Sequence, residues 1–176
     1  MLGAIIEAVS GEDYFDYVLT HIFKPAGMEN TDSYEADAAT PNLATGYTLR
    51  ASGSGERRSN VYTKPVRGSS AGGGYSTAED LLKFTLALQN LKLLGGEYTK
   101  WLLSGMDSAP PAHAQKSTVP ITEGDLGIAG GAPGINAILE LDVASGYTLI
   151  VLSNYDPPSA EKVGRQIRAW LPRSEN

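Results

Sequence analysis

A glycine cluster in front of a run of branched aliphatic residues most constrains how this chain can fold. The stretch GDLGIAGGAPGINAILELD, residues 124–142, holds five glycines and one proline. Its aliphatic part, Ile135–Leu141, and a second run, Tyr147–Leu152, are separated by a turn-forming segment, which predicts an antiparallel hairpin. Glycines beside a strand let a substrate or another backbone approach it closely. We therefore expect either a substrate or a neighbouring segment of the chain to lie close against this strand.

Two N-terminal segments show the apolar spacing of amphipathic helices. The first is expected to end at Ser10–Gly11, and the second at Pro25. We expect the two helices to share one buried side. The apolar positions are Leu2, Ile5, Ile6 and Val9 in the first helix, and Phe15, Val18, Leu19 and Ile22 in the second.

Three further helices are expected along the chain. Ser76 and Glu79 form an S-x-x-E capping box, with Gly95–Gly96 expected to close that helix. The apolar face of that helix is expected to be Leu81, Phe84, Leu88 and Leu91. A short helix is expected over Glu97–Leu103. A final helix is expected to be capped by Ser159 and ended by Pro172, and it carries Val163, Ile167 and Trp170.

The order of these elements predicts an α+β fold, with an antiparallel sheet flanked by helices. The length of 176 residues fits one domain, 1–176. The polar, Gly/Ser-rich tract after Asn30 predicts a mobile loop at about 50–70, preceded by a short strand at Tyr47–Leu49.

Composition excludes several classes of function. The net charge of −6 gives no basic stripe for nucleic acid, and no apolar run is long enough to span a membrane. The chain has no cysteine, and its two histidines, His21 and His113, are too far apart in sequence to suggest a ligand pair. We expect no metal and no cofactor, and neither histidine is expected to be catalytic.

Four segments, in this order over nearly the whole chain, carry a family resemblance. They are LGAIIEAVSGEDYFDYVLTHIFKPAGMENT, GGGYSTAEDLLKF, GGAPGINAILELD and YTLIVLSN. Together they resemble the serine β-lactamase and penicillin-binding-protein superfamily, in its class C β-lactamase-like, esterase and D-aminopeptidase branch. The resemblance implies the β-lactamase/DD-peptidase fold. It also implies a periplasmic or exported parent, although nothing in the chain itself indicates a compartment.

The resemblance implies chemistry resting on three elements: a Ser-x-x-Lys nucleophile pair, a Tyr-x-Asn, and a Lys-Thr-Gly or His-x-Gly strand. The first two would lie before Met1, and the opening helix has no capping residue, so we expect a C-terminal part of the fold. The only Ser-x-x-Lys is Ser159–Lys162, which is interpreted as a helix start, because a motif outside its structural context is weak.

The third element falls on the glycine cluster. By resemblance, Ile128, Ala129 and Gly130 occupy its three positions, and the Gly131 N–H would be the oxyanion donor, with Gly130, Gly131 and Ala132 facing substrate. Ile128 carries neither charge nor donor, so the side-chain chemistry of the motif is expected to be lost while its backbone geometry persists.

Other candidates have simpler interpretations. The glycines do not match a nucleotide-binding G-x-G-x-x-G, and Gly72–Gly74 is expected to be a packing turn rather than an anion site. Glu79 and Asp80 suit a helix N-terminus. Glu123 and Asp125, beside the glycine strand, are expected to be exposed loop acids, although they could contact a substrate.

Two functional hypotheses remain open. In the first, the chain is part of a hydrolase that transfers the acyl group of an amide or ester, such as a β-lactam, a D-amino-acid peptide or a small ester, and these 176 residues are inactive alone. In the second, it is a non-catalytic binding module that self-associates through exposed apolar faces. Ile128 favours the second hypothesis. The sequence leaves open whether this chain is itself an enzyme.

Overall fold

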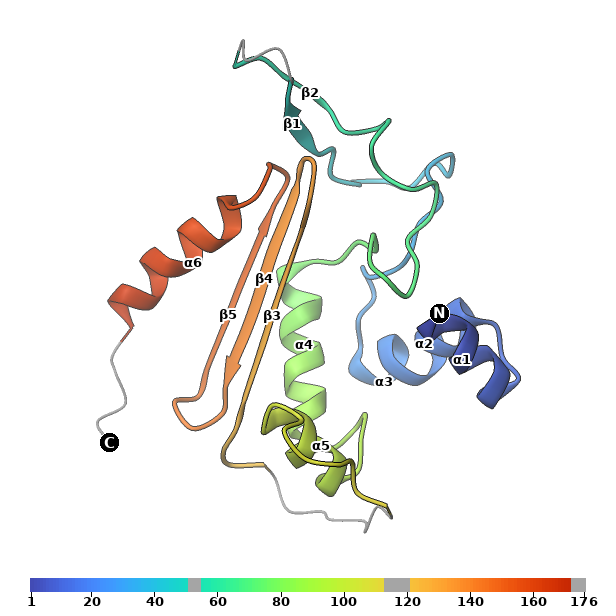
Figure 1. Ribbon diagram of the computed structural model, residues 1–176, viewed down its shortest axis with the longest axis vertical. Helices are drawn as coiled ribbons and strands as arrows, with labels where there is room; N and C mark the ends of the chain where they lie inside the picture. The colour runs from blue at the N-terminus through green and yellow to red at the C-terminus, as the bar shows by residue number, and fades with distance from the viewer. Residues whose placement is uncertain (51–54, 113–120, 172–176) are drawn as a thin grey trace. The chain divides into compact units, whose positions relative to one another are not determined.

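The computed structural model describes residues 1–50, 55–112 and 121–171 (Figure 1). These residues form two compact units. One unit contains Met1–Leu43 and Lys64–Leu94, and the other contains Ala44–Thr63 and the residues from Gly95 onward. The α+β class is confirmed, since both units carry helices and the second also carries antiparallel sheets. The single domain and the mobility of the loop at 50–70 stay predictions.

Helix α1 (Leu2–Ser10) opens the first unit and ends where predicted. Gly11 adopts φ 75°, and its N–H donates to Glu7 O at 2.9 Å, the left-handed ending that glycine allows. The prediction that the aliphatic side of this helix is buried is wrong. Exposed fractions are 52% for Ile5 and 84% for Val9, whereas Gly3 is buried.

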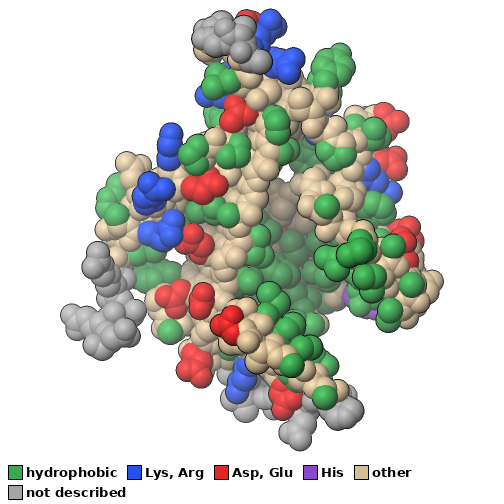
Figure 2. Space-filling model, viewed as in Figure 1, with side chains coloured by type: hydrophobic (Ala, Val, Ile, Leu, Met, Phe, Trp, Pro, Cys, Tyr) green, Lys and Arg blue, Asp and Glu red, His purple; other side chains and the backbone are tan. Residues whose placement is uncertain are grey.

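Gly3 explains which side of α1 is buried. Its N–H donates to Ser70 Oγ at 3.1 Å, and a Cβ on Gly3 would lie 3.1 Å from the same atom. The helix therefore packs through its smallest residue, and the larger aliphatic side chains remain on the surface. Figure 2 shows hydrophobic side chains exposed in the region of α1.

The second predicted helix is three consecutive pieces: α2 (Tyr14–Val18), a π-helical turn η1 (Leu19–Phe23) and α3 (Lys24–Ala26). Pro25 does not stop it, contrary to expectation. Proline lies in the first turn of α3, directly after the π-helical turn, and Gly27 ends the segment with φ 75°.

Helix α4 (Ala78–Gln89) begins one residue later than the capping box predicts. Thr77 is the cap, and its Oγ1 accepts from the Asp80 N–H at 3.1 Å. Ser76 Oγ instead lies 2.8 Å from Thr31 Oγ1. The helix also ends before Gly95, because Leu91 adopts φ 57° and the Lys92 N–H folds back onto Ala87 O.

Asp80, in the first turn of α4, has no exposed surface. Its Oδ2 accepts from the Asn30 N–H at 2.6 Å and from the Thr31 hydroxyl at 2.9 Å, and Lys83 Nζ lies 3.2 Å from its Oδ1. Burial raises the pKa of Asp80, but these donors outweigh it and hold that pKa below its usual value. The carboxylate thus joins the segment after α3 to α4.

A three-stranded antiparallel sheet in the order β3-β4-β5 dominates the second unit (Figure 1). Its strands are β3 (Asp125–Ala132), β4 (Ile135–Asp142) and β5 (Tyr147–Ser153), which confirms the predicted hairpin. Helix α5 (Gly96–Leu103) contacts β3.

Helix α6 (Ser159–Trp170) packs on β4 and β5. Its contact face is Ala160, Gly164 and Ile167, because Ile138 and Leu149 of the sheet approach the helix there. The other two apolar residues named for this helix, Val163 and Trp170, are 46% and 76% exposed. Pro172, the expected end of the helix, lies outside the described residues.

The predicted strand at Tyr47–Leu49 is present as β1. It pairs with β2 (Arg57–Ser59), which falls inside the predicted loop. Among the described residues, no helix has both the length and the apolar character needed to cross a membrane.

Candidate active-site edge

Strand β3 has a free edge, since it pairs with β4 on one side and no strand within the described residues pairs on the other. All of its residues are exposed except Leu126, which is half-buried. Ile128, Ala129, Gly130, Gly131 and Ala132 follow one another along this strand, so the structure brings the predicted site residues together.

Hydrogen bonding along the β3–β4 ladder fixes which groups point to that edge. Opposed residues of an antiparallel pair alternate between bonded and non-bonded. The Val143 N–H donates to Gly124 O at 3.0 Å, just before the first pair of the ladder. Counting from there makes Gly131↔Asn136 a non-bonded pair. The Gly131 N–H therefore points away from β4 and toward the free edge of β3. A donor to a substrate oxyanion at that edge needs this direction.

Gly130 and Gly131 differ in how closely other atoms approach them. A Cβ on Gly131 would lie 2.5 Å from Pro157 Cγ, so this position must be glycine for the strand to pack beneath the proline. A Cβ on Gly130 would meet no atom within 4 Å. Gly130 and Ile128 share the opposite face of β3 from Gly131, because side chains alternate along a strand. Ile128, 52% exposed, presents only hydrocarbon there.

Asn136, on β4 opposite Gly131, is a functional candidate that the sequence analysis missed. It is 1% exposed. Its Nδ2 donates to Gly130 O and to Glu161 Oε1, both at 3.0 Å, and its Oδ1 accepts from the Ala160 N–H at 2.6 Å. The available signal was an amide side chain within a largely aliphatic strand, because a buried amide needs partners.

Asp156 anchors the tip of the β3–β4 hairpin. Its Oδ1 accepts from the Gly134 N–H at 2.8 Å, and its Oδ2 accepts from the Leu49 N–H of β1 at 3.0 Å. The hydroxyl of Thr48, with these two N–H groups and Arg57, outweighs burial and holds the pKa of Asp156 below its usual value. The tip next to Gly131 is thus tied to the β1–β2 pair.

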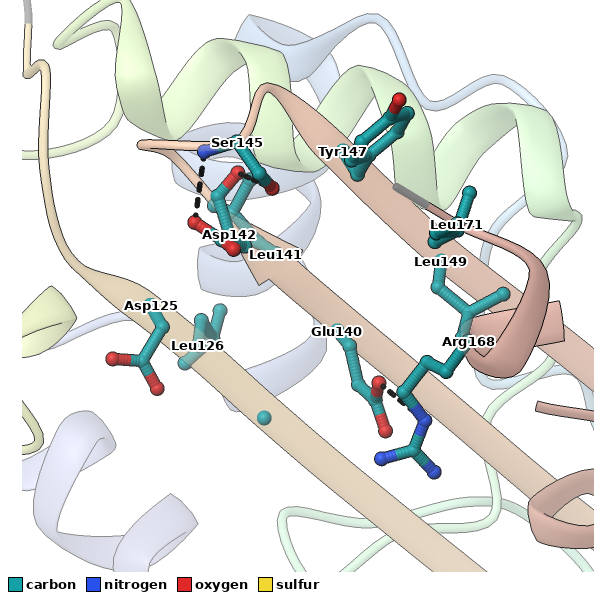
Figure 3. Close-up of a pocket in the computed structure, with 11 residues that line it drawn as sticks. Asp125, Leu126, Glu140, Leu141, Asp142, Ser145, Tyr147, Leu149, Arg168 and Leu171 are labelled. Carbon is teal, nitrogen blue, oxygen red and sulfur yellow. Dashed lines mark hydrogen bonds and ion pairs between the residues drawn. The ribbon is translucent and has the colours of Figure 1, made fainter. Parts of the chain in front are cut away.

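A cavity of about 510 Å³ lies at the other end of the sheet (Figure 3). Arg168 of α6 pairs there with Glu140 across 3.4 Å, and Asp125 lines the same space. Asp125 is six residues from Gly131 along β3, about 20 Å at the usual rise of a strand. The structure therefore does not bring Asp125 to the glycine edge, and Glu123 is an exposed residue outside the strand.

Ser159 does not cap α6, contrary to expectation, since Pro158 is the cap residue. The Ser159 hydroxyl donates to Ser153 Oγ at 2.8 Å, and it also lies 3.3 Å from Tyr155 O. The N–H of Ala160 is instead satisfied by Asn136, which leaves the Ser159 hydroxyl free for β5.

The remaining candidates lie away from β3 or outside the described residues. His21 is exposed and pairs with Glu12 at 3.1 Å in the first unit, while His113 is not among the described residues. Gly73, with φ 90°, packs against Gly68 in a tight turn, as predicted. Within residues 1–50, 55–112 and 121–171, no three His, Cys, Asp or Glu side chains form a group that could hold a metal ion.

Comparison with known proteins gives a consistent picture. The sequence profile of the family described as Beta-lactamase matches residues 1–171. The "Putative penicillin-binding protein PbpX" of Bacillus subtilis (strain 168) is 32% identical over 154 residues, which cover 86% of this chain and 37% of that protein.

Two solved structures resemble the fold. A penicillin-binding protein from Bacillus halodurans matches with a TM-score of 0.80 and 29% identity, covering 97% of this chain and 53% of that one. A D-amino acid amidase from Ochrobactrum anthropi, in complex with L-phenylalanine amide, matches with a TM-score of 0.68 and 25% identity, covering 95% and 54%. The chain thus spans about a third to a half of the length of each of these three proteins.

Proposed function

Because the chain belongs to the Beta-lactamase family of serine hydrolases, we propose that β3 is the oxyanion-binding edge of a serine acyl-transfer site. The substrate class is an amide or ester: a β-lactam, a D-amino-acid amide or peptide, or a small ester. The D-amino acid amidase among its structural relatives supports the amide. The outward Gly131 N–H on an exposed strand carries the proposal.

The chemistry requires such a donor. When a serine oxygen attacks the acyl carbon, the carbonyl oxygen takes up negative charge, and a preorganised N–H at 2.7–3.1 Å stabilises it. As the bond to the leaving nitrogen or oxygen breaks, that atom takes up the proton that the serine has lost, the carbonyl re-forms and the acyl group stays on the serine. The Gly131 N–H is part of the main chain, so no substitution at Ile128 removes it.

The nucleophile comes from elsewhere in this proposal. The 176 residues contain no Tyr-x-Asn, and Ser159–Lys162 is their single Ser-x-x-Lys. Ser159 lies at the start of α6, which packs on the face of the sheet opposite to Ile128. Its hydroxyl already donates to Ser153 Oγ. In this proposal the 176 residues contribute oxyanion binding. Hydrolytic turnover needs a nucleophilic serine that they do not provide.

Two measurements on the 176-residue protein test this. Titration with phenylphosphonate, followed by amide NMR, is expected to shift the Gly131 resonance most, because the phosphonate presents oxyanions to that N–H. Intact-protein mass spectrometry after a fluorophosphonate or a penicillin is expected to show no covalent adduct.

Ser159→Ala is the matched variant for the mass measurement and is expected to behave as the wild type. A stoichiometric adduct that this variant abolishes would overturn the assignment of the nucleophile. Phosphonate shifts centred on the Asp125 end of the sheet, with Gly131 unmoved, would overturn the oxyanion edge.

Self-association is a second candidate function, favoured by the exposed stripe of α1. Leu2, Ile5 and Val9 are 64%, 52% and 84% exposed along one side of that helix. Contiguous apolar surface of this kind drives association. We expect the protein to form oligomers at high concentration and Val9→Glu to shift it toward monomer, as measured by light scattering.

The control for this prediction is Tyr62→Lys, which removes an apolar side chain that is 94% exposed in the other unit. It is expected to leave the oligomer unchanged. A wild-type protein that stays monodisperse as a monomer at high concentration would exclude this candidate.

A further inference from the structure

The orientation of one peptide group decides whether β3 can bind an oxyanion. The Gly130 carbonyl and the Gly131 N–H belong to the same planar trans peptide, so they point in opposite directions. Whatever holds the Gly130 carbonyl toward β4 therefore also holds the Gly131 N–H toward the free edge.

Gly131 packs beneath Pro157, but the two glycines before it in β3 supply little restraint. A Cβ would meet no atom within 4 Å at Gly127 or at Gly130, so neither position is enclosed by its surroundings. Glycine also reaches backbone conformations that other residues avoid. The orientation of the Gly130–Gly131 peptide must then depend on neighbouring groups, in addition to the ladder bonds of β3.

Asn136 is the side chain that contacts this peptide from behind. Its Nδ2 donates to Gly130 O at 3.0 Å from a position with 1% exposure. The amide cannot rotate by half a turn, because its Oδ1 would then face Gly130 O and its Nδ2 would face the Ala160 N–H. The network thus permits one orientation of the amide.

Glu161 supports that orientation from α6. Its Oε1 accepts the other Nδ2 proton of Asn136 at 3.0 Å. Its Oε2 is buried and has no hydrogen-bond partner among the described residues, so the side chain is retained at a cost in solvation. Such a cost is consistent with a role beyond packing.

We infer that Asn136, supported by Glu161, is a positioning residue that aims the Gly131 N–H at the substrate oxyanion. The inference rests on the proposed function of the β3 edge. It adds that the donor is oriented through the Gly130 carbonyl, by a side chain on the covered side of the sheet that touches no substrate.

Asn136→Asp tests this with little change of shape. The variant keeps the oxygen that accepts from the Ala160 N–H, but it replaces the donor facing Gly130 O and Glu161 with an acceptor. We expect phenylphosphonate to bind about tenfold more weakly, from loss of one hydrogen bond and new repulsion. Gly131 amide hydrogen exchange is expected to change at least about threefold, since altered peptide orientation changes solvent access.

Asn60→Asp is the matched control. Asn60 is 4% exposed, and its Nδ2 donates at 3.1 Å to Pro133 O, in the same hairpin but outside the Gly130–Gly131 peptide. We expect a comparable loss of Tm with phosphonate affinity and Gly131 exchange close to wild type. Glu161→Ala gives a second test if Asn136→Asp fails to fold, with an expected loss of affinity of about threefold.

The outcomes separate the two proposals. A wild type in which phosphonate leaves Gly131 unmoved overturns the oxyanion edge, and the exchange comparison then still judges the positioning role. A wild type that binds at Gly131, with Asn136→Asp and Glu161→Ala binding equally well and exchanging at the same rate, overturns the role of Asn136. The same losses in Asn60→Asp would also overturn it, because they would reflect general loosening of the hairpin.

Discussion

Replacing Asp80 with alanine is expected to lower the free energy of unfolding by about 3 kcal/mol, or about 9 °C in Tm for a chain of this size. The carboxylate has no exposed surface. Its removal leaves the Asn30 N–H and the Thr31 hydroxyl without their acceptor in a site closed to water. Thermal and urea unfolding, each followed by circular dichroism, measure the loss.

Glu79→Ala is the control, because Glu79 lies in the same helical turn and pairs with the same Lys83 but is 75% exposed. Its replacement is expected to change stability by less than about 0.5 kcal/mol. Equal losses in the two variants would show that the charge near the helix start matters rather than the buried acceptor.

Acid should erase part of the contribution of Asp80. Its pKa is lowered in the folded state, so its stabilisation is complete above the unfolded-state value of about 3.9 and is lost as pH falls through the folded-state value. The stability difference between wild type and Asp80→Asn should therefore be larger at pH 7 than at pH 2. A difference that is independent of pH would contradict the charged state assigned to the carboxyl.

Asp156→Ala is expected to cost about 2 kcal/mol of stability and to release β1 from the β3–β4 hairpin. One carboxylate accepts from Gly134 at the hairpin tip and from Leu49 of β1, so its removal breaks both links. Faster amide hydrogen exchange at Leu49 and Gly134 measures the release, and urea unfolding measures the stability.

Asp142→Ala is the comparison for that variant. Hydrogen bonds from Ser145 also lower the pKa of Asp142, but this carboxylate stays within its own turn, where it accepts from the Ser145 N–H at 3.0 Å. Exchange at Leu49 is expected to be unchanged. A loosened β1 in this variant would mean that the hairpin responds as a whole to any weakened turn.

The elements with a strong local signal were predictable from sequence. The β4–β5 hairpin follows from two aliphatic runs around a turn, and β1 was placed at its observed bounds, Tyr47–Leu49. The end of α1 followed from Gly11. In each case, residues within a short window determine the conformation, so no distant contact was needed to predict it.

The errors have tertiary causes. The start of α4 moved from Ser76 to Thr77 because Thr31, distant in sequence, pairs with the Ser76 hydroxyl. The start of α6 is satisfied by Asn136 from a strand rather than by Ser159. Periodicity identified the aliphatic side of α1, but it could not show that Gly3 would make the packing contact instead.

The candidate site was predicted in part for the same reason. Alignment of the glycine cluster with the family motif identified the strand and its residues, and the ladder then showed which N–H groups face outward. Asn136 and Pro157 act on Gly131 from other elements. No local spacing could connect them to it before the chain was folded.

The packing of Pro157 against Gly131 has a consequence for how this edge changes in evolution. Every residue except proline supplies a main-chain N–H, so the identity of residue 131 does not create the donor. Selection for the donor would act on the residues around it. A side chain at position 131 and a ring at position 157 exclude each other. Variation at the two positions is therefore expected to be coupled, whereas Ile128 lies on the opposite face of β3 and is outside this contact.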